Sequence, residues 1–205
     1  RANRASGGIA IGHNVKATHN NTIAVGVGTT ASGSNSTVVG SSASASGASS
    51  AAYGTQSMAN GKGAIAVGPG ANAGKSNTVG TTDGEREGTT AVGRVAKATE
   101  AAATAVGWSA NASAKNATAL GYGATASLAD GVALGSNSVT TTDKGQVGYN
   151  PADNRTNKYS DQAGAIGTST LAAVSVGNGT TATRQITGLA AGTADTDAVN
   201  VRSEE

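Results

Sequence analysis

The 205-residue sequence has no cysteine and no phenylalanine, and it contains one tryptophan and one methionine. The absence of cysteine excludes a disulfide framework and thiolate metal sites, and it suits a bacterial protein outside the cytoplasm. Because large apolar side chains are so few, the hydrophobic 37% of the chain is mostly alanine and valine, which bury little area per residue. A conventional globular core is therefore not expected. Either the chain is disordered, or it gains buried surface from copies of itself.

Charge is also scarce, because charged residues make up 13% of the chain and the formal net charge is +2. The 14 basic residues are scattered, so no nucleic-acid partner is expected. No run approaches the roughly 18 apolar residues of a membrane span. The amino terminus also lacks the charged and apolar regions of a signal peptide. Membrane attachment is expected only through an anchor that lies outside this sequence.

Glycine is what the sequence has in abundance, with 31 residues, many of them placed with a period of fourteen. Short aliphatic runs end at Gly12, Gly26, Gly40, Gly54 and Gly68, and the period resumes at Gly93, Gly107, Gly121 and Gly135. A fixed period of this size predicts a solenoid in which each repeat is one coil. Disorder is disfavoured, because low-complexity chains lack aliphatic residues that keep such a phase.

Side-chain size alternates on both sides of each glycine. The residue before the glycine is large and mostly β-branched and the one before that is usually alanine, as in Ala24-Val25-Gly26. A second alternation follows, as in Ser42-Ala43-Ser44-Ala45-Ser46, with alanine expected to point inward. Each coil is therefore predicted to be two short strands joined by tight turns, around a lumen that holds only alanine-sized side chains.

The large residues before the glycines have no partner within the chain. They are predicted to form a continuous stripe that becomes the seam of a symmetric homo-oligomer. The seam residues are Ile11, Val25, Val39, Val67, Val92, Val106, Leu120 and Leu134. Tyr53 occupies the same position in one coil, and Val79 occupies it in a further coil expected to end at Gly80.

These repeats resemble the YadA-like heads of trimeric autotransporter adhesins from Gram-negative bacteria, whose coils read roughly Asn-Ser-Val-Ala-Ile-Gly-x-x-Ser. The matching stretches include residues 21–26 and 116–121, and the resemblance covers residues 6–140. It implies an all-β fold, namely a left-handed parallel β-roll of 14-residue coils in an intertwined homotrimer. It also implies a place on the cell surface, anchored in the outer membrane. The implied partners are extracellular matrix proteins such as collagen, fibronectin or laminin, or host cells, with self-association in biofilms as a further activity.

Residues 164–201 resemble the last coil and the neck of these adhesins, the element that narrows the roll into a coiled-coil stalk. The neck residues singled out by this match are Arg184, Gln185, Ile186, Asp195 and Asp197. Independently of the resemblance, Asp195 and Asp197 offer N-cap groups and negative charge where a helix would begin. Residues 202–205 either begin the stalk or were added for expression.

Two insertions interrupt the period. Residues 81–88 are expected to form a charged loop inside a head roll of residues 1–139, and residues 140–163 resemble the head insert motif of the family. Both are expected to protrude, because the corner of a solenoid tolerates extra residues.

No catalytic constellation emerges from the repeats. Both histidines, His13 and His19, lie in the first coil, so a Ser/His/Asp arrangement is not supported. A β-helix acyltransferase would need three-sided coils of hexapeptides, whereas fourteen residues allow two faces. An ice-binding solenoid would need a regular threonine array, which is not present. The protein is predicted not to be an enzyme and to need no metal or cofactor.

One set of side chains stands out from the repeat. The residue after the glycine is small in most coils, but it is Arg94, Trp108 and Tyr122 in three successive ones, so these three are expected to stack as a ladder. Such residues often anchor protein interfaces. Two interpretations stay open: the ladder seals a groove between subunits, or it contacts a host ligand. The predicted function is a multivalent adhesin head. The alternative is a spacer of the adhesin fibre with ligand binding elsewhere.

Overall fold

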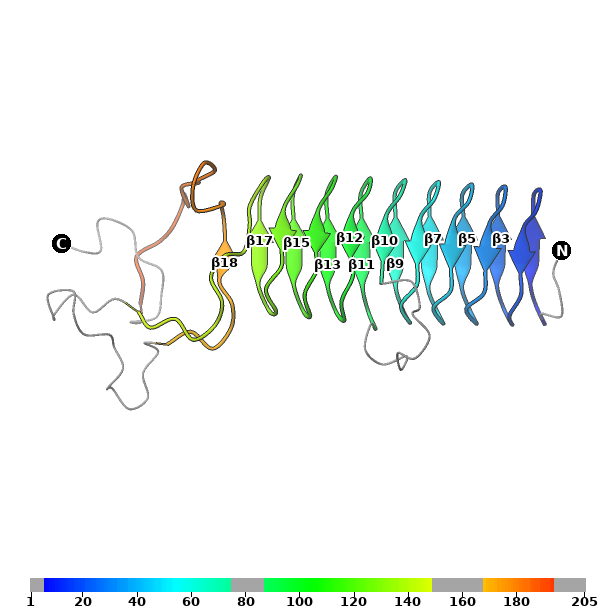
Figure 1. The fold of residues 1–205 in the computed structure, drawn as a ribbon, viewed down its shortest axis with the longest axis horizontal. Helices are drawn as coiled ribbons and strands as arrows, with labels where there is room; N and C mark the ends of the chain where they lie inside the picture. The colour runs from blue at the N-terminus through cyan, green and yellow to red at the C-terminus, as the bar shows by residue number, and fades with distance from the viewer. Residues whose placement is uncertain (1–5, 75–86, 149–167, 194–205) are drawn as a thin grey trace, which may run out of the picture.

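The structure, a computed structural model, describes residues 6–74, 87–148 and 168–193. These residues form an elongated parallel β-solenoid that runs from the coil of β1 to β18 (Figure 1). The described part of the chain contains no helix, and hence none that is long and apolar enough to cross a membrane. The prediction of an all-β parallel roll is confirmed.

Each coil contributes one strand to each of two sheets. The ten-stranded sheet contains, in spatial order, β1 (Ile9–Ile11), β3 (Ile23–Val25), β5 (Thr37–Val39), β7 (Ala51–Tyr53), β9 (Ile65–Val67), β11 (Thr90–Val92), β13 (Thr104–Val106), β15 (Thr118–Leu120), β17 (Val132–Leu134) and β18 (Val174–Ser175). The eight-stranded sheet contains β2 (Lys16–Ala17), β4 (Thr30–Ala31), β6 (Ser44–Ala45), β8 (Met58–Ala59), β10 (Asn72–Ala73), β12 (Lys97–Ala98), β14 (Asn111–Ala112) and β16 (Thr125–Ala126).

The fourteen-residue period of the sequence is the register of the sheets. Ala10 pairs with Ala24, and Ala105 pairs with Ala119, so equivalent residues of successive coils lie directly above one another. Side chains of one column therefore stack along the whole solenoid, at the spacing of about 4.8 Å that separates paired strands. A residue's position relative to its glycine thus fixes its face of the molecule.

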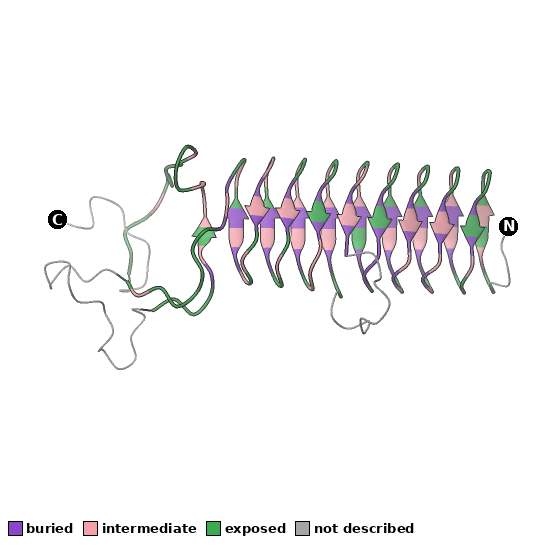
Figure 2. Cartoon of the chain, in the orientation of Figure 1, coloured by how far each residue is buried: buried purple, intermediate pink, exposed green. Residues whose placement is uncertain are grey.

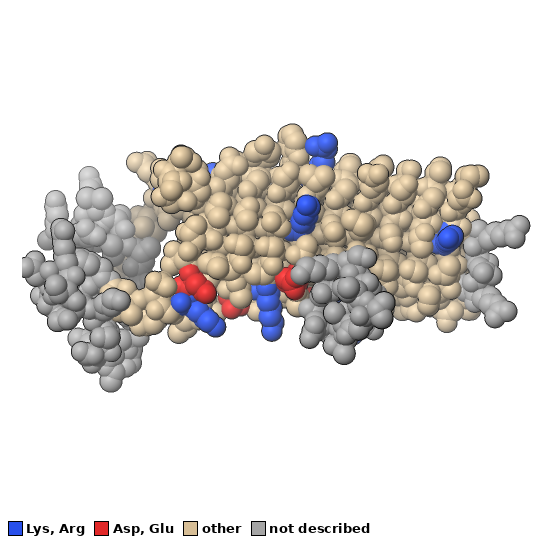
Figure 3. Space-filling view, viewed as in Figure 1, with Lys and Arg blue, Asp and Glu red and all other residues tan. Residues whose placement is uncertain are grey.

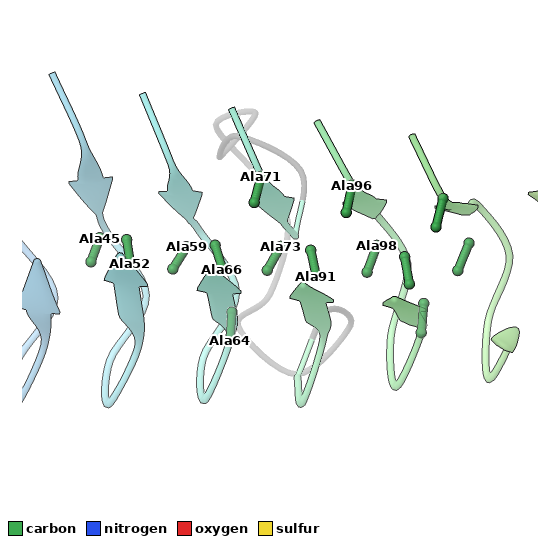
Figure 4. Packing of buried hydrophobic residues seen from close by; sticks show 14 of the residues in the cluster. Ala45, Ala52, Ala59, Ala64, Ala66, Ala71, Ala73, Ala91, Ala96 and Ala98 are labelled. Carbon is green, nitrogen blue, oxygen red and sulfur yellow. The ribbon is translucent and has the colours of Figure 1, made fainter. Parts of the chain in front are cut away.

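The core between the two sheets is built from alanine. Apart from Val15 and Val38, every buried apolar residue in the described part of the chain is an alanine. Figure 4 shows alanines of the two sheets pointing toward one another, and Figure 2 shows the buried positions repeating from coil to coil. This confirms the predicted lumen, which is too narrow for larger side chains in most coils.

Two kinds of residue make the tight corners possible. Glycines such as Gly107, with φ of 134°, occupy the corner after each strand of the ten-stranded sheet, as predicted. The turn before that strand uses a left-handed residue, which is often asparagine because its short polar side chain tolerates this conformation. Asn21 and Asn116 have φ of 55° and 57° there, and they donate hydrogen bonds from their amides to Asn35 (3.2 Å) and Asp130 (2.8 Å) of the next coil.

The prediction of a separate coil that ends at Gly80 is wrong. Strand β11 pairs directly with β9, with Ala91 opposite Ala66, so no rung separates them. The extra residues in this repeat fall on 75–86, outside the described residues, together with most of the loop expected at 81–88. Glu87 and Gly88 are described, and they belong to the turn of the next coil, where the Gly88 amide donates to the Lys62 carbonyl (3.0 Å).

The second insertion also leaves the sheet register intact. Strand β18 pairs with β17, with Val174 opposite Val132, although the two strands lie far apart in sequence. The flanks of the insertion meet in an antiparallel bridge between Val147 and Thr168. Much of the expected head insert motif, residues 149–163, lies outside the described residues. Its two described flanks therefore come together at one place beside the last coil.

Candidate functional site

The outer face of the ten-stranded sheet carries an apolar surface, here called the seam face. Its main column consists of the eight predicted seam residues together with Tyr53, which the strand register places in line between Val39 and Val67. Ile11 is 58% exposed and Leu120 43%, values that are high for large aliphatic side chains. Val39 and Leu134 are also exposed, whereas Val25, Val67, Val92 and Val106 are half-buried.

A second column widens the seam face, because the first residue of each strand points to the same side as the third. In the N-terminal half this column holds, in order, Ile9, Ile23, Thr37, Ala51 and Ile65, and beyond the insertion it holds Thr90, Thr104, Thr118 and Val132. Contiguous apolar surface of this kind marks an interaction site on a soluble protein. The seam face is therefore the strongest candidate for contact with other subunits, and it is most apolar in its N-terminal half.

The structure brings Arg94, Trp108 and Tyr122 together in a ladder at the corner beside the seam face. The ring centroids of Trp108 and Tyr122 lie 5.3 Å apart with an interplanar angle of 71°, an edge-to-face arrangement. The Arg94 guanidinium carbon lies 5.4 Å from the centre of the Trp108 ring, a cation–π distance. Trp108 is 52% exposed and Tyr122 51%, so each ring covers its neighbour and still faces outward.

The backbone holds the ladder at fixed intervals. On one side of Trp108, the Gly107 amide donates to the Val92 carbonyl (2.8 Å), and on the other the Ser109 amide donates to the Arg94 carbonyl (3.0 Å). The Gly123 amide makes the equivalent bond to the Trp108 carbonyl (2.9 Å). Each ladder residue is therefore clamped between two hydrogen bonds of the stack. The backbone beneath the ladder is thus held by the stack itself.

A polar row runs parallel to the ladder. The outward-facing residues of β12, β14 and β16 are Lys97, Asn111 and Thr125, and they stand opposite one another in the eight-stranded sheet. Each lies three residues after a ladder residue of its own coil. Unlike the ladder, this row was not predicted from the sequence, although the fourteen-residue period already places its three residues in one column. Charged side chains are sparse on the face of the solenoid drawn in Figure 3.

At the C-terminal end, Arg184 fastens the predicted neck to the last regular coil. Its guanidinium donates to the carbonyls of Ser136 and Val176 and to the Ser138 hydroxyl (2.9 Å for the last). It lies flat against Gly135, where a Cβ atom would be 2.9 Å from the guanidinium carbon. The glycine of this coil therefore serves a second purpose, which is to leave space for the arginine.

A tight loop directs the chain toward this contact. The side-chain oxygen of Asn178 accepts hydrogen bonds from the backbone amides of Thr181 (2.9 Å) and Ala182 (2.8 Å). The backbone amide of Asn178 donates to the Ala182 carbonyl (2.9 Å). Ile186, two residues beyond Arg184, is 65% exposed and Gln185 is exposed as well. The other two predicted neck residues, Asp195 and Asp197, lie outside the described residues.

Stacked two-strand coils with an alanine lumen and an exposed aliphatic face define the class of two-sided parallel β-solenoids. Residues 5–29, 31–57, 59–79, 87–110 and 112–138 match the family described as YadA head domain repeat (2 copies), which is more than half of the chain. The chain belongs to this family and is a YadA-like trimeric autotransporter adhesin head.

A solved structure agrees with this assignment. The chain is similar to the collagen-binding domain of Yersinia adhesin YadA, with 27% sequence identity and a TM-score of 0.52. The similarity covers 98% of this chain and 83% of that one. No match was found among curated proteins. The shared fold thus extends well beyond the individual repeats.

Proposed function

We propose that this head works as a homotrimer on the surface of a Gram-negative bacterium, anchored in the outer membrane, where it attaches the cell to extracellular matrix proteins. The observation that carries the proposal is the similarity to the YadA collagen-binding domain over 98% of the chain. Collagen is therefore the first matrix protein to test, and fibronectin, laminin and host cell surfaces follow from the family resemblance. Self-association between cells is a further activity of the same head.

The energetics of the single chain support assembly through the seam face. Alanine contributes little buried apolar area, so the lumen offsets the cost of ordering the backbone poorly. The seam face can supply the buried apolar area that the lumen lacks. Covering a valine, leucine or isoleucine side chain stabilises by about 1.5–3 kcal/mol when burial is complete. Three seam faces that meet around a threefold axis would cover the whole main column of each chain.

Attachment by such a head is multivalent. Stacked coils repeat the same polar columns along the solenoid, and a trimer presents three copies of each. Weak contacts then add through high effective concentration, which raises avidity by about 10²–10⁴ over a single contact. A fibrous ligand that is itself repetitive, as collagen is, suits this geometry best.

The test is binding of the purified trimer to surfaces coated with collagen, fibronectin or laminin at several densities, with albumin as the control coat. Multivalent attachment predicts that retention falls more steeply than in proportion to ligand density. Binding in simple proportion to density would contradict the multivalent mechanism. Failure to bind any matrix protein would favour the second candidate, a structural spacer of the adhesin fibre. The uniform columns of the N-terminal coils are the feature that supports a spacer.

A further inference from the structure

The ladder and its polar row have a chemical character that the matrix-binding proposal does not use. Trp108 and Tyr122 offer two apolar rings, each about half exposed, in adjacent coils. Sugar rings present faces of C–H groups that stack on such aromatic surfaces, and their hydroxyl groups need hydrogen-bonding partners beside the stack. Asn111 and Thr125 provide an amide and a hydroxyl in the neighbouring column.

Carboxylates lie at only one of the two corners of the described coils. In the described coils the carboxylates Glu87, Glu100 and Asp130 all lie in turns that precede strands of the ten-stranded sheet. Arg94 and Lys97 lie away from these turns. Arg94 is in the corner that follows β11, and Lys97 begins β12 of the eight-stranded sheet. Within the described residues, neither cation is within salt-bridge distance of a carboxylate. This corner therefore suits a ligand that carries negative charge.

We propose that the ladder surface, defined as Arg94, Trp108 and Tyr122 with Lys97, Asn111 and Thr125, binds acidic glycans. These are sugar chains that bear carboxylate or sulfate groups. The chain of sugars would run along the solenoid axis, with its rings against Trp108 and Tyr122. Its anionic groups would meet Arg94 and Lys97, where guanidinium and ammonium groups make charge-assisted hydrogen bonds.

Preorganisation favours this surface as a binding site. The hydrogen bonds of the stack fix the backbone on both sides of Trp108, and the strand register fixes Lys97 beside Asn111. Binding therefore costs little ordering of the protein backbone. A second copy of the chain is a poorer occupant, because the described coils offer few carboxylates to pair with Arg94 and Lys97.

The single tryptophan of the sequence reports on this surface directly. Fluorescence of Trp108 in the purified chain is measured with a heparin hexasaccharide, a hyaluronan hexasaccharide, cellohexaose as a neutral sugar and polyglutamate as an acidic peptide. The two acidic sugars are expected to change the emission and protect Trp108 from acrylamide quenching. The effect should weaken as salt is added, because exposed charges are screened. Cellohexaose at the same concentration should have a much smaller effect.

Variants separate a specific site from general charge attraction. Tyr122→Ala, Arg94→Ala and Lys97→Ala are each expected to weaken heparin binding about tenfold, as truncation of an interface anchor does. Lys16→Ala is the matched control, because Lys16 occupies the position of Lys97 in β2, and it should bind normally. Light scattering checks that every variant keeps the mass of the wild type.

Four results would overturn the proposal. The first is that neither acidic sugar changes the fluorescence of Trp108. The second is that Lys16→Ala weakens heparin binding as much as Lys97→Ala does. Equal binding of polyglutamate would indicate a site for acidic peptides instead. Shielding of Trp108 from acrylamide in the ligand-free protein would show that another subunit covers the ladder.

Discussion

The glycine column makes a sharp prediction about stability, which Gly107→Ala tests. A Cβ atom at Gly107 would lie 2.5 Å from the carbonyl oxygen of Gly121 in the next coil and 2.6 Å from its carbonyl carbon. Both atoms belong to the backbone and are held by the stack, so neither can move aside cheaply. In addition, the φ of 134° is one that residues with a Cβ atom rarely adopt.

The two penalties can be estimated separately. A non-glycine residue in a sparsely populated backbone region costs about 1–3 kcal/mol. Forcing a methyl group into a closely packed place costs about 1–3 kcal/mol more. Gly107→Ala should therefore lose about 2–6 kcal/mol of unfolding free energy per chain. For a chain of this size, each kcal/mol corresponds to about 2–4 °C, so the melting temperature should fall by roughly 4–24 °C.

Gly88→Asn is the matched control, measured in the same urea and thermal unfolding experiments by circular dichroism. Gly88 has φ of 68° and nothing within 4 Å of a built Cβ atom. It shares its column with Asn116 and Asp130, which have φ of 57° and 62°. Its substitution should change stability by less than about 1 kcal/mol. If Gly107→Ala had the same urea midpoint and melting temperature as Gly88→Asn, the close stacking of the glycine column would be refuted.

Three further substitutions probe the lumen, the seam face and the neck. Ala105→Leu overfills the lumen and should cost at least about 1–3 kcal/mol of unfolding free energy, measured in urea. Leu120→Asp brings three carboxylates together at the proposed axis and should abolish the trimer in light scattering, whereas Thr30→Asp, on the outer face of the eight-stranded sheet, should not. Arg184→Ala leaves the Ser136 carbonyl without its charged donor and should cost about 1–3 kcal/mol locally. Faster hydrogen exchange in the last coil would report that loss, with Arg184→Lys restoring part of it.

Each of these has a result that contradicts it. An Ala105→Leu variant as stable as the wild type would mean that the lumen is not close-packed. Leu120→Asp that kept the wild-type mass would remove Leu120 from the subunit interface. Unchanged hydrogen exchange in Arg184→Ala would mean that the arginine does not hold the neck to the last coil.

Much of the fold could be predicted from the sequence because the fold is periodic. The spacing of Gly26 and Gly40 sets the strand register, and the alternation around them sets which side chains face the lumen. Every coil repeats the same information, so one misplaced residue changes little. The same regularity places Trp108 directly between Arg94 and Tyr122, since column membership alone determines vertical neighbours.

The features that escaped prediction are those that break the period. Val79 and Gly80 have the sequence pattern of the end of a coil. However, β9 and β11 pair directly with each other, because the strands on either side of the extra residues can form their backbone hydrogen bonds without them. The contact between Arg184 and Gly135 joins residues that lie far apart in the sequence, and no local sequence pattern predicts it. The angle of 71° between the Trp108 and Tyr122 rings likewise depends on side-chain packing that spacing does not encode.

The proposed adhesin head consists of three chains joined through their seam faces. The most direct measurement is the mass of the purified protein by light scattering during dilution. Assembly through the seam face predicts a mass three times that of the 19.5 kDa chain, and it predicts that the chains unfold as the trimer dissociates. A folded monomer that stayed stable at all concentrations would contradict it, because the exposed aliphatic column would then need no partner.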